Sequence, residues 1–90
     1  MEFEFDPLKS SANKDKHGVD FEEARSLWLD ENLVLAAARS AGEKRQVALG
    51  FLKGRHWAAF FTMRGDRIRI ISVRRARQRE IERYENDASR

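Results

Sequence analysis

The chain has 90 residues, enough for one domain over residues 1–90 with a modest hydrophobic core. It contains no cysteine, which excludes disulfides, thiolate metal sites and cysteine nucleophiles. The net charge of +3 is unevenly distributed: residues 1–52 carry 7 Lys and Arg against 10 Asp and Glu, whereas residues 53–90 carry 11 against 5. Arginine supplies 13 of the 18 basic residues, and its planar fork matches phosphate, so we expect a basic, phosphate-binding surface.

The N-terminal part of the sequence predicts one strand and two helices. Residues 1–5 alternate apolar and acidic side chains, as a half-buried edge strand does. A helix is expected to start at Asp6, with proline in its first turn, and to end at Gly18. A second helix is expected from Asp20, where Glu23 completes the pattern of a capping box.

The remainder predicts three antiparallel strands and a final helix. Residues 30–45 are hard to assign: Leu33 to Ala38 fits a short strand or a helical turn, and residues 40–43 fit a loop. The expected strands are joined by short turns, and the middle one is apolar on both faces and therefore central. They span residues 46–52, 56–63 and 67–73, and the helix spans residues 75–86. We therefore expect an α+β fold: a small antiparallel sheet with two N-terminal helices and a C-terminal helix packed on one side of it.

Several functions and locations are disfavoured by the sequence. It has no Walker loop and no dinucleotide-binding glycine pattern, and its two histidines lie far apart without carboxylates at ligand spacing. We therefore expect no cofactor and no metal site. No apolar run approaches the roughly 20 residues of a membrane span, and the acidic start is unlike a signal peptide. These observations favour a cytoplasmic protein without membrane contacts.

The arginines near the third expected strand form the candidate functional site. Strict alternation along that strand places Ile68, Ile70, Ser72 and Arg74 on one face. A groove formed by Lys53, Arg64, Arg74 and Arg75, with Ser72 beside it, is compatible with this pattern. Ser72 also fits a packed strand residue, and Arg69 fits an ion pair with Glu43 or Glu80.

Such a site could cleave RNA without a metal ion. The 2′-hydroxyl of RNA can attack the neighbouring phosphate, so the protein must align the chain, stabilise charge and assist proton transfer. Arginine suits the first two tasks but is too basic to act as a general base. The candidate proton carriers are His17, His56 and Tyr84. Two of them also have a structural interpretation: His17 as a packed or capping residue, and Tyr84 as a buried ring.

Three motifs, in the same order, resemble the BrnT toxin family. They are DPLKSSANKDKHGVDFEEA at Asp6–Ala24, GEKRQVALG at Gly42–Gly50, and RIRIISVRRARQREIERY at Arg67–Tyr84. The resemblance implies a RelE-like ribonuclease toxin of a bacterial type II toxin–antitoxin pair, which blocks translation. It also implies a BrnA-type antitoxin that neutralises the toxin and supplies the binding to operator DNA.

The resemblance also implies which residues contact RNA. Carried over to this sequence, the catalytic candidates are Arg64, Ser72, Arg74 and Arg75. We expect Lys53, Arg55 and Arg67 to bind the RNA substrate. Two other functions fit the same basic surface: a non-catalytic nucleic-acid-binding or repressor subunit, and a scaffold whose basic helix docks an acidic partner.

Overall fold

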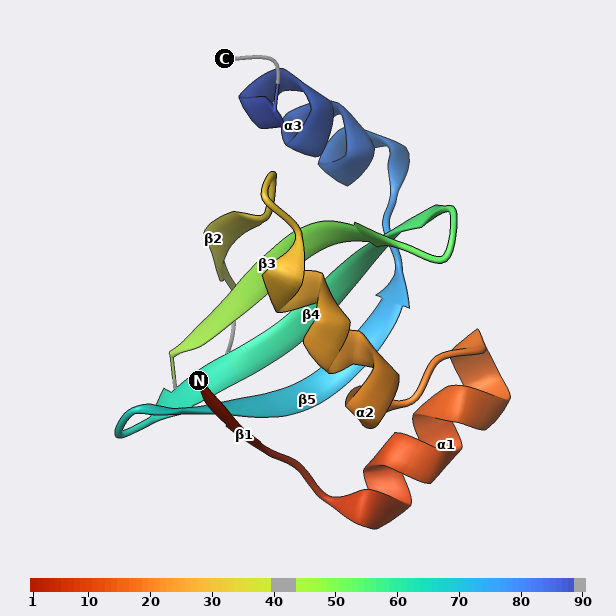
Figure 1. The fold of residues 1–90 in the computed structure, drawn as a ribbon, viewed down its shortest axis with the longest axis vertical. Coiled ribbons are helices and arrows are strands. Elements are labelled where there is room, and N and C mark those ends of the chain that lie inside the picture. Colours follow the sequence, from red (N-terminus) through yellow and green to blue (C-terminus); the bar gives the residue numbers. More distant parts are fainter. Residues whose placement is uncertain (40–43, 89–90) are drawn as a thin grey trace.

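The computed structural model describes residues 1–39 and 44–88, and its centre is a five-stranded sheet (Figure 1). The spatial order of the strands is β1-β5-β4-β3-β2, so β4 is central, as its apolar character predicts. The segment Leu33 to Ala38, which fits either a strand or a helical turn in the sequence, contains strand β2. The strands are β1 (Glu2–Glu4), β2 (Val34–Ala38), β3 (Arg45–Leu52), β4 (Arg55–Arg64) and β5 (Arg67–Arg75). The loop expected at residues 40–43 lies outside the described residues.

The sheet is mixed, which corrects the expectation of a purely antiparallel sheet. Strands β2 to β5 pair antiparallel, but β1 pairs parallel with β5, with Phe3 beside Ile68. Tight turns fix the direction of the later strands, whereas the helical segment between β1 and β2 leaves the direction of β1 open to tertiary packing. Because β1 carries glutamates opposite arginines of β5, the parallel register also places opposite charges side by side.

The N-terminal helices start and end where the sequence predicts. Helix α1 (Pro7–His17) is capped by the Asp6 carboxylate, which accepts a hydrogen bond from the Leu8 backbone, and ends at Gly18 with φ 85°. Helix α2 (Phe21–Ala24) has the complete capping box of Asp20 and Glu23. It continues as a 3-10 helix, η1 (Arg25–Leu29), so the second predicted helix is confirmed in two parts.

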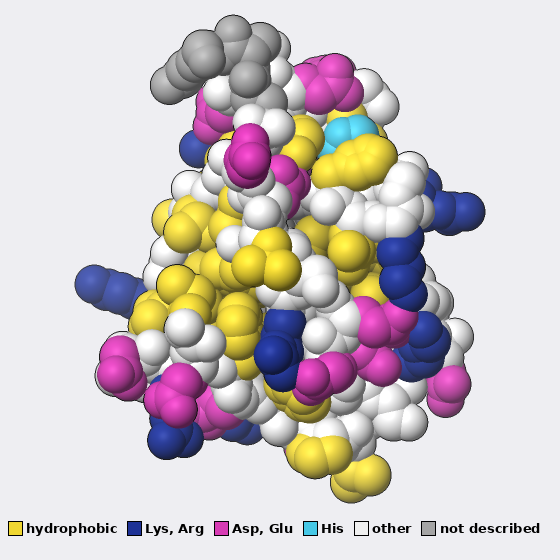
Figure 2. Space-filling model, viewed as in Figure 1, with side chains coloured by type: hydrophobic (Ala, Val, Ile, Leu, Met, Phe, Trp, Pro, Cys, Tyr) yellow, Lys and Arg dark blue, Asp and Glu magenta, His cyan; other side chains and the backbone are white. Residues whose placement is uncertain are grey.

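The two faces of the sheet have separate cores. Helices α2 and η1 cover one face, with α1 packed along the edge of β5 next to them, and buried apolar residues of β4 and β5 such as Phe61 and Val73 pack there with Phe21 and Leu27. Figure 2 views this helix-covered side, where hydrophobic side chains gather left of the centre and charged ones lie below and to the right of them. The last helix, α3 (Gln78–Ala88), packs through Tyr84 on the opposite face, near one end. The expectation that all helices share one side is therefore wrong, because β3 and β4 are apolar on both faces.

A β-bulge in β5 decides which side chains reach which face. Phe61 lies opposite Ile70 but Phe60 lies opposite Ser72, so Ile71 is an extra residue without its own partner. Strict alternation is broken there: Ile70 and Val73 are buried under the N-terminal helices, and Ser72 and Arg74 lie on the other face. The predicted shared face of Ile68, Ile70, Ser72 and Arg74 is therefore wrong.

Helix α1 completes the edge of β5 beyond the short strand β1. The last residue of β1, Glu4, lies beside Arg69, so the following part of β5 has no strand on this side. The buried Asn13 of α1 takes over: its Oδ1 accepts a hydrogen bond from the Val73 backbone N–H at 3.1 Å, and its Nδ2 donates to the Val19 carbonyl. One amide thus satisfies backbone groups that would otherwise be buried without partners.

Candidate active site

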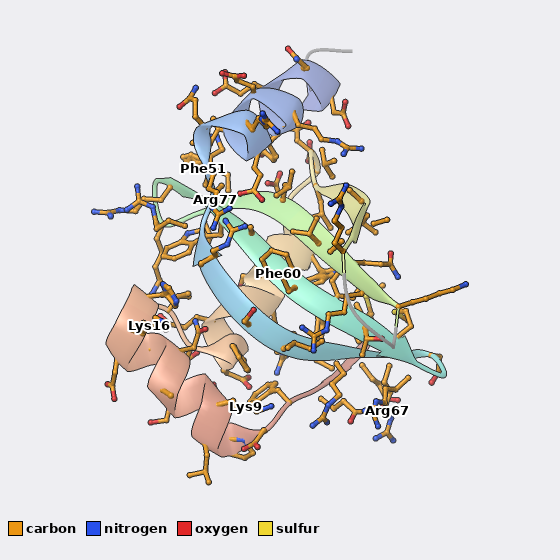
Figure 3. The ribbon with its side chains drawn as sticks, turned by 180° about the vertical axis from the view of Figure 1, so that it is seen from behind. Lys9, Lys16, Phe51, Phe60, Arg67 and Arg77 are labelled. Carbon is orange, nitrogen blue, oxygen red and sulfur yellow. The ribbon has the colours of Figure 1, made fainter. Side chains whose placement is uncertain are left out.

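Four of the predicted site residues come together at one end of the uncovered face of the sheet. We call this surface the open face: the side of the sheet opposite α1, α2 and η1 that bears Phe60, Ser72 and Arg74 (Figure 3). Ser72 lies opposite Phe60, and Arg74 lies opposite Ala58. His56 precedes Ala58 by two residues and so shares its face, diagonal to Arg74 at roughly 7–8 Å between Cα atoms. Tyr84 of α3 closes this end of the surface.

The guanidinium of Arg74 is fixed on three sides. Its Nη1 and Nη2 donate to the two carboxylate oxygens of Glu80 at 2.8 and 3.1 Å, and Nη1 also donates to the Arg75 carbonyl. Its central carbon lies 5.0 Å from the centroid of the Phe60 ring. A guanidinium has five N–H donors, and these contacts use three of them. No described residue accepts from the Nε–H or the second Nη2–H, which form a parallel pair of donors along one edge.

Glu80 belongs both to this site and to the start of α3. It is the third residue of the helix, and its Oε1 also accepts a hydrogen bond from the Arg77 backbone N–H at 2.8 Å, in the manner of a capping box. Burial raises the pKa of Glu80, but the hydrogen bonds from Arg74 and the Arg77 backbone outweigh it, so the net pKa lies below its ordinary value. The carboxylate therefore stays charged and holds Arg74 in place at neutral pH.

The second part of the site is a contact between His56, Tyr84 and Asp30. The ring centroids of His56 and Tyr84 are 5.2 Å apart in an edge-to-face arrangement, and Phe51 flanks His56 at 4.9 Å. Among the residues that the structure describes, none hydrogen-bonds to the His56 side chain. The imidazole is therefore oriented by aromatic packing, while its nitrogens stay available for proton transfer.

Asp30 anchors Tyr84 from the chain segment that follows η1. Its Oδ2 accepts hydrogen bonds from the Tyr84 hydroxyl at 2.6 Å and from the Phe51 backbone at 2.9 Å, and its Oδ1 accepts one from the Asn32 backbone. This segment approaches β3 closely at Gly50, where a Cβ would lie 3.0 Å from Leu27 Cδ2. Glycine at that position therefore allows the approach that brings Asp30 to Tyr84.

These contacts move the pKa values of Tyr84 and Asp30 apart. Burial and the hydrogen bond to Asp30 raise the pKa of Tyr84 to about 12. Burial raises the pKa of Asp30, but the hydrogen bonds from Tyr84 and the Asn32 and Phe51 backbones, together with the nearby His56, bring it below its ordinary value. Tyr84 is thus a protonated phenol that donates a hydrogen bond to the Asp30 carboxylate, which suits an orienting role better than that of a general base.

Several other predicted residues lie near this end of the sheet but point elsewhere. Arg75 lies opposite Trp57 and its guanidinium is 6.0 Å from that ring, on the side of the N-terminal helices. Lys53, in the turn between β3 and β4, forms an ion pair with Glu23 of α2. Hydrogen bonds from Lys14 and Lys53 lower the pKa of Glu23 to about 2. The predicted groove of Lys53, Arg64, Arg74 and Arg75 therefore does not form as one surface.

Arg64 and Arg67 lie at the other end of the sheet. They face each other where the β4–β5 hairpin closes, and Arg67 Nε is 3.7 Å from Glu2 Oε2. Arg64 is six residues along β4 from the partner of Arg74, a span of about 20 Å at roughly 3.3 Å per residue. Figure 3 shows Arg67 and Arg77 at opposite ends of the sheet, with Phe60 between them. Arg64 and Arg74 therefore cannot hold the same phosphate.

The remaining predicted residues lie elsewhere in the fold or near the Lys53 turn. His17 ends α1, which packs beside β5 with the N-terminal helices, so it does not approach His56. Arg55 starts β4 at the turn that also bears Lys53. Arg69 pairs with Glu4 at 2.8 Å, so the predicted pair with Glu80 is wrong, and Glu43 lies outside the described residues.

Sequence reasoning missed three residues of the site: Asp30, Phe60 and Glu80. Asp30 looks like a helix-end carboxylate, and its contact with Tyr84 spans 54 positions. Phe60 looks like core because β4 is apolar throughout. Glu80 had a usable signal, since a glutamate three residues into a helix is a common capping residue. Within residues 1–39 and 44–88, no group of three or more His, Cys, Asp or Glu side chains is arranged to hold a metal ion.

None of the helices in the described residues has the length and apolar character needed to span a bilayer. A comparison with curated proteins gave no match. A family model described as "Ribonuclease toxin, BrnT, of type II toxin-antitoxin system" matches residues 5–80. The matched segment includes all of β5 and reaches Glu80 in α3. The chain therefore belongs to the BrnT family of ribonuclease toxins of type II toxin–antitoxin systems.

Proposed function

We propose that this chain is an endoribonuclease that cleaves RNA on the open face, without a metal ion, and thereby blocks translation in the cytoplasm. The observation that carries this proposal is the geometry of Arg74. Glu80 and Phe60 hold its guanidinium, and two parallel N–H donors remain for a phosphate. Because the group is already fixed, little reorganisation is needed when charge develops on the phosphate.

The proposed chemical step uses the nucleophile that RNA itself contains. The 2′-hydroxyl oxygen attacks phosphorus, the bond from phosphorus to the 5′ oxygen breaks, and a 2′,3′-cyclic phosphate and a 5′-hydroxyl result. Negative charge grows on the non-bridging oxygens, where Arg74 donates its two free N–H groups. The exposed Ser72 hydroxyl, two residues from Arg74 on the same face, serves as a further hydrogen-bond donor.

Proton transfer is assigned to His56, which takes the proton of the attacking 2′-hydroxyl, while water supplies the proton that the departing 5′ oxygen takes up. Imidazole suits this task near neutral pH, and His56 is the predicted proton carrier that shares a face with Arg74 without a hydrogen-bond partner among the described residues. Tyr84 orients the imidazole through ring packing, and Asp30 holds Tyr84. In this scheme His17 has no catalytic role.

The other basic residues bind RNA away from the scissile phosphate. Lys53, Arg55 and Arg75 lie at the end of the sheet that bears Arg74. Lys53 and Arg75 point toward the helix-covered side, so they contact phosphates where the RNA chain passes around this end. Arg64 and Arg67 lie about 20 Å away and contact phosphates farther along the chain. These contacts add affinity and salt dependence rather than sequence information.

Membership in a type II toxin–antitoxin family implies an antitoxin partner. We propose that this partner is a BrnA-type protein that covers the open face or places a helix beside α3, and that operator DNA is bound through the antitoxin alone. Amide hydrogen exchange of the complex tests this placement. Protection confined to α1 and α2 would contradict it.

The test of the function is RNA cleavage by purified chain in excess EDTA. We expect cleavage products with 2′,3′-cyclic phosphate ends, and no cleavage at a position where the 2′-hydroxyl is replaced by hydrogen. Intact RNA together with salt-sensitive binding would support the alternative, a non-catalytic nucleic-acid-binding subunit. Cleavage that requires added magnesium would refute the proposed metal-free step.

A further inference from the structure

The outer edge of β2 lacks the features that normally protect an edge strand. β2 is the last strand in the sheet order, and its sequence, VLAAA, has no charge and no proline. Its five residues pair with β3 in unbroken register, so no bulge distorts it. The opposite edge differs: β1 has three residues, and two of them are glutamates that face arginines. An exposed, regular, apolar edge is a template for pairing with another strand.

The side chains around this edge are also exposed and apolar. Leu35 is 51% exposed, and Ala37 is exposed. Leu35 lies opposite Ala48, so it is on the side of the sheet that η1 covers. Figure 2 shows hydrophobic side chains gathered on the left of the view, the side on which Figure 1 draws β2.

The two ends of β2 carry opposite, unpaired charges. Glu31 precedes the strand, Arg39 follows it, and Arg45 lies opposite Ala38 at the same end as Arg39. Within the described residues, none of the three forms an ion pair. When two copies of one strand pair antiparallel, the start of each lies beside the end of the other. Such pairing brings Glu31 of each copy toward the basic end of the other.

We propose that β2 pairs antiparallel with β2 of a second copy of this chain, with the two-fold axis at Ala36. In this register Ala36 faces Ala36 of the other copy, and Leu35 faces Ala37. The two sheets then continue into each other, Leu35 loses its exposure, and the charges at the strand ends become complementary. The interface is self-complementary, as a two-fold symmetric dimer requires. This inference concerns assembly and does not depend on the proposed RNA cleavage.

The test is the mass of the purified chain as a function of concentration, by light scattering or sedimentation. One copy has a mass of 10.5 kDa, and we expect the wild type to approach twice that value as concentration rises. In the double variant Leu35→Lys with Ala37→Lys, each lysine faces a lysine of the other copy, which gives two like-charged pairs across the interface. This should weaken association at least about tenfold. The double variant Leu35→Glu with Ala37→Glu should be weakened similarly.

A mixture of the lysine and glutamate variants should associate again, because each lysine then faces a glutamate, and added salt should reduce this recovery. The matched control is Leu8→Lys with Ala12→Lys, which makes the same two exchanges at exposed positions of α1 and should leave association unchanged. Circular dichroism verifies the fold of each variant. A monomeric wild type, or a dimer that the β2 variants do not weaken, would overturn the proposal. Loss of antitoxin binding by β2 variants of a monomeric chain would assign the edge to an antitoxin strand instead.

Discussion

Replacing Tyr84 by phenylalanine removes one hydrogen bond and leaves the ring. The lost bond is the 2.6 Å contact from the Tyr84 hydroxyl to Asp30 Oδ2. A hydrogen bond to a charged group contributes about 1.5–3 kcal/mol. Asp30 keeps the Phe51 and Asn32 backbone donors, so we expect a loss of about 1.5 kcal/mol in the free energy of unfolding. For a domain of this size, that lowers Tm by roughly 6–12 °C.

Urea unfolding and thermal melting of Tyr84→Phe provide the measurement. The urea midpoint should fall while the m-value stays constant, because the surface exposed on unfolding hardly changes. A double-mutant cycle with Asp30→Ala isolates the pair, and we expect a coupling energy of about 1 kcal/mol. Tyr84→Ala should cost more, about 3–5 kcal/mol, because the ring also packs against buried residues such as Leu49 and Ala58. A coupling energy near zero would show that Asp30 does not hold α3 on the sheet.

The hydrogen bond between Tyr84 and Asp30 predicts that the free energy of unfolding depends on pH in both alkali and acid. The pKa of Tyr84 in the folded protein, about 12, lies above its ordinary value of 10.0. The stability that Tyr84 contributes is therefore fully present below pH 10 and is lost as the pH rises through 12. The pKa of Asp30 is lowered, so its contribution is present above its ordinary value and is lost as the pH falls through the folded value. Wild type and Tyr84→Phe should therefore converge in stability in strong alkali. A constant difference across that range would contradict the assignment.

Three further predictions address the candidate active site and the Lys53 end of the sheet. Arg74→Lys should lower RNA cleavage at least about 100-fold because the parallel pair of N–H donors is lost. Arg64→Lys is the matched exchange at the far end of the sheet, and it should change cleavage less than about threefold under saturating RNA. Equal losses in both variants would refute the location of the site. His56→Gln should lower cleavage by roughly 100-fold or more with unchanged circular dichroism, and full activity would remove His56 from the mechanism. Glu23→Gln keeps the shape of the capping box but loses the charge, so it should destabilise the fold at pH 7. Because the pKa of Glu23 in the folded protein is about 2, the difference in stability between wild type and variant should vanish as the pH falls from about 4.5 to 2. Acid titrations of both proteins would show this.

The sequence predicted local structure well because local structure depends on neighbouring residues. The cap at Asp6, the left-handed Gly18 and the Asp20–Glu23 capping box each act within one helical turn, and all three are present. The three later strands are delimited by short turns, so their positions also followed from the sequence. The central place of β4 followed from its apolar residues on both faces.

The candidate active site was harder to predict because its geometry depends on contacts that are distant in sequence. The bulge at Ile71 reverses the expected alternation, so Ser72 and Arg74 leave the face of Ile70. Asp30 and Tyr84 are 54 positions apart in the sequence, and only tertiary packing brings them together. The parallel direction of β1 likewise depends on tertiary packing, since no turn sets it. Membership in the BrnT family was accessible from the sequence, because its motifs are continuous segments.

The unpaired Ile71 has a consequence for changes in chain length. Loss of one residue from an ordinary strand turns every later side chain to the other side of the sheet. At this point β5 already contains one residue more than its neighbour needs, so deletion of Ile71 would leave Val73 inside and Arg74 outside. A homologous toxin could therefore lack this residue and keep the same side chains buried, whereas loss of one residue from β4 would move the later side chains to the opposite face.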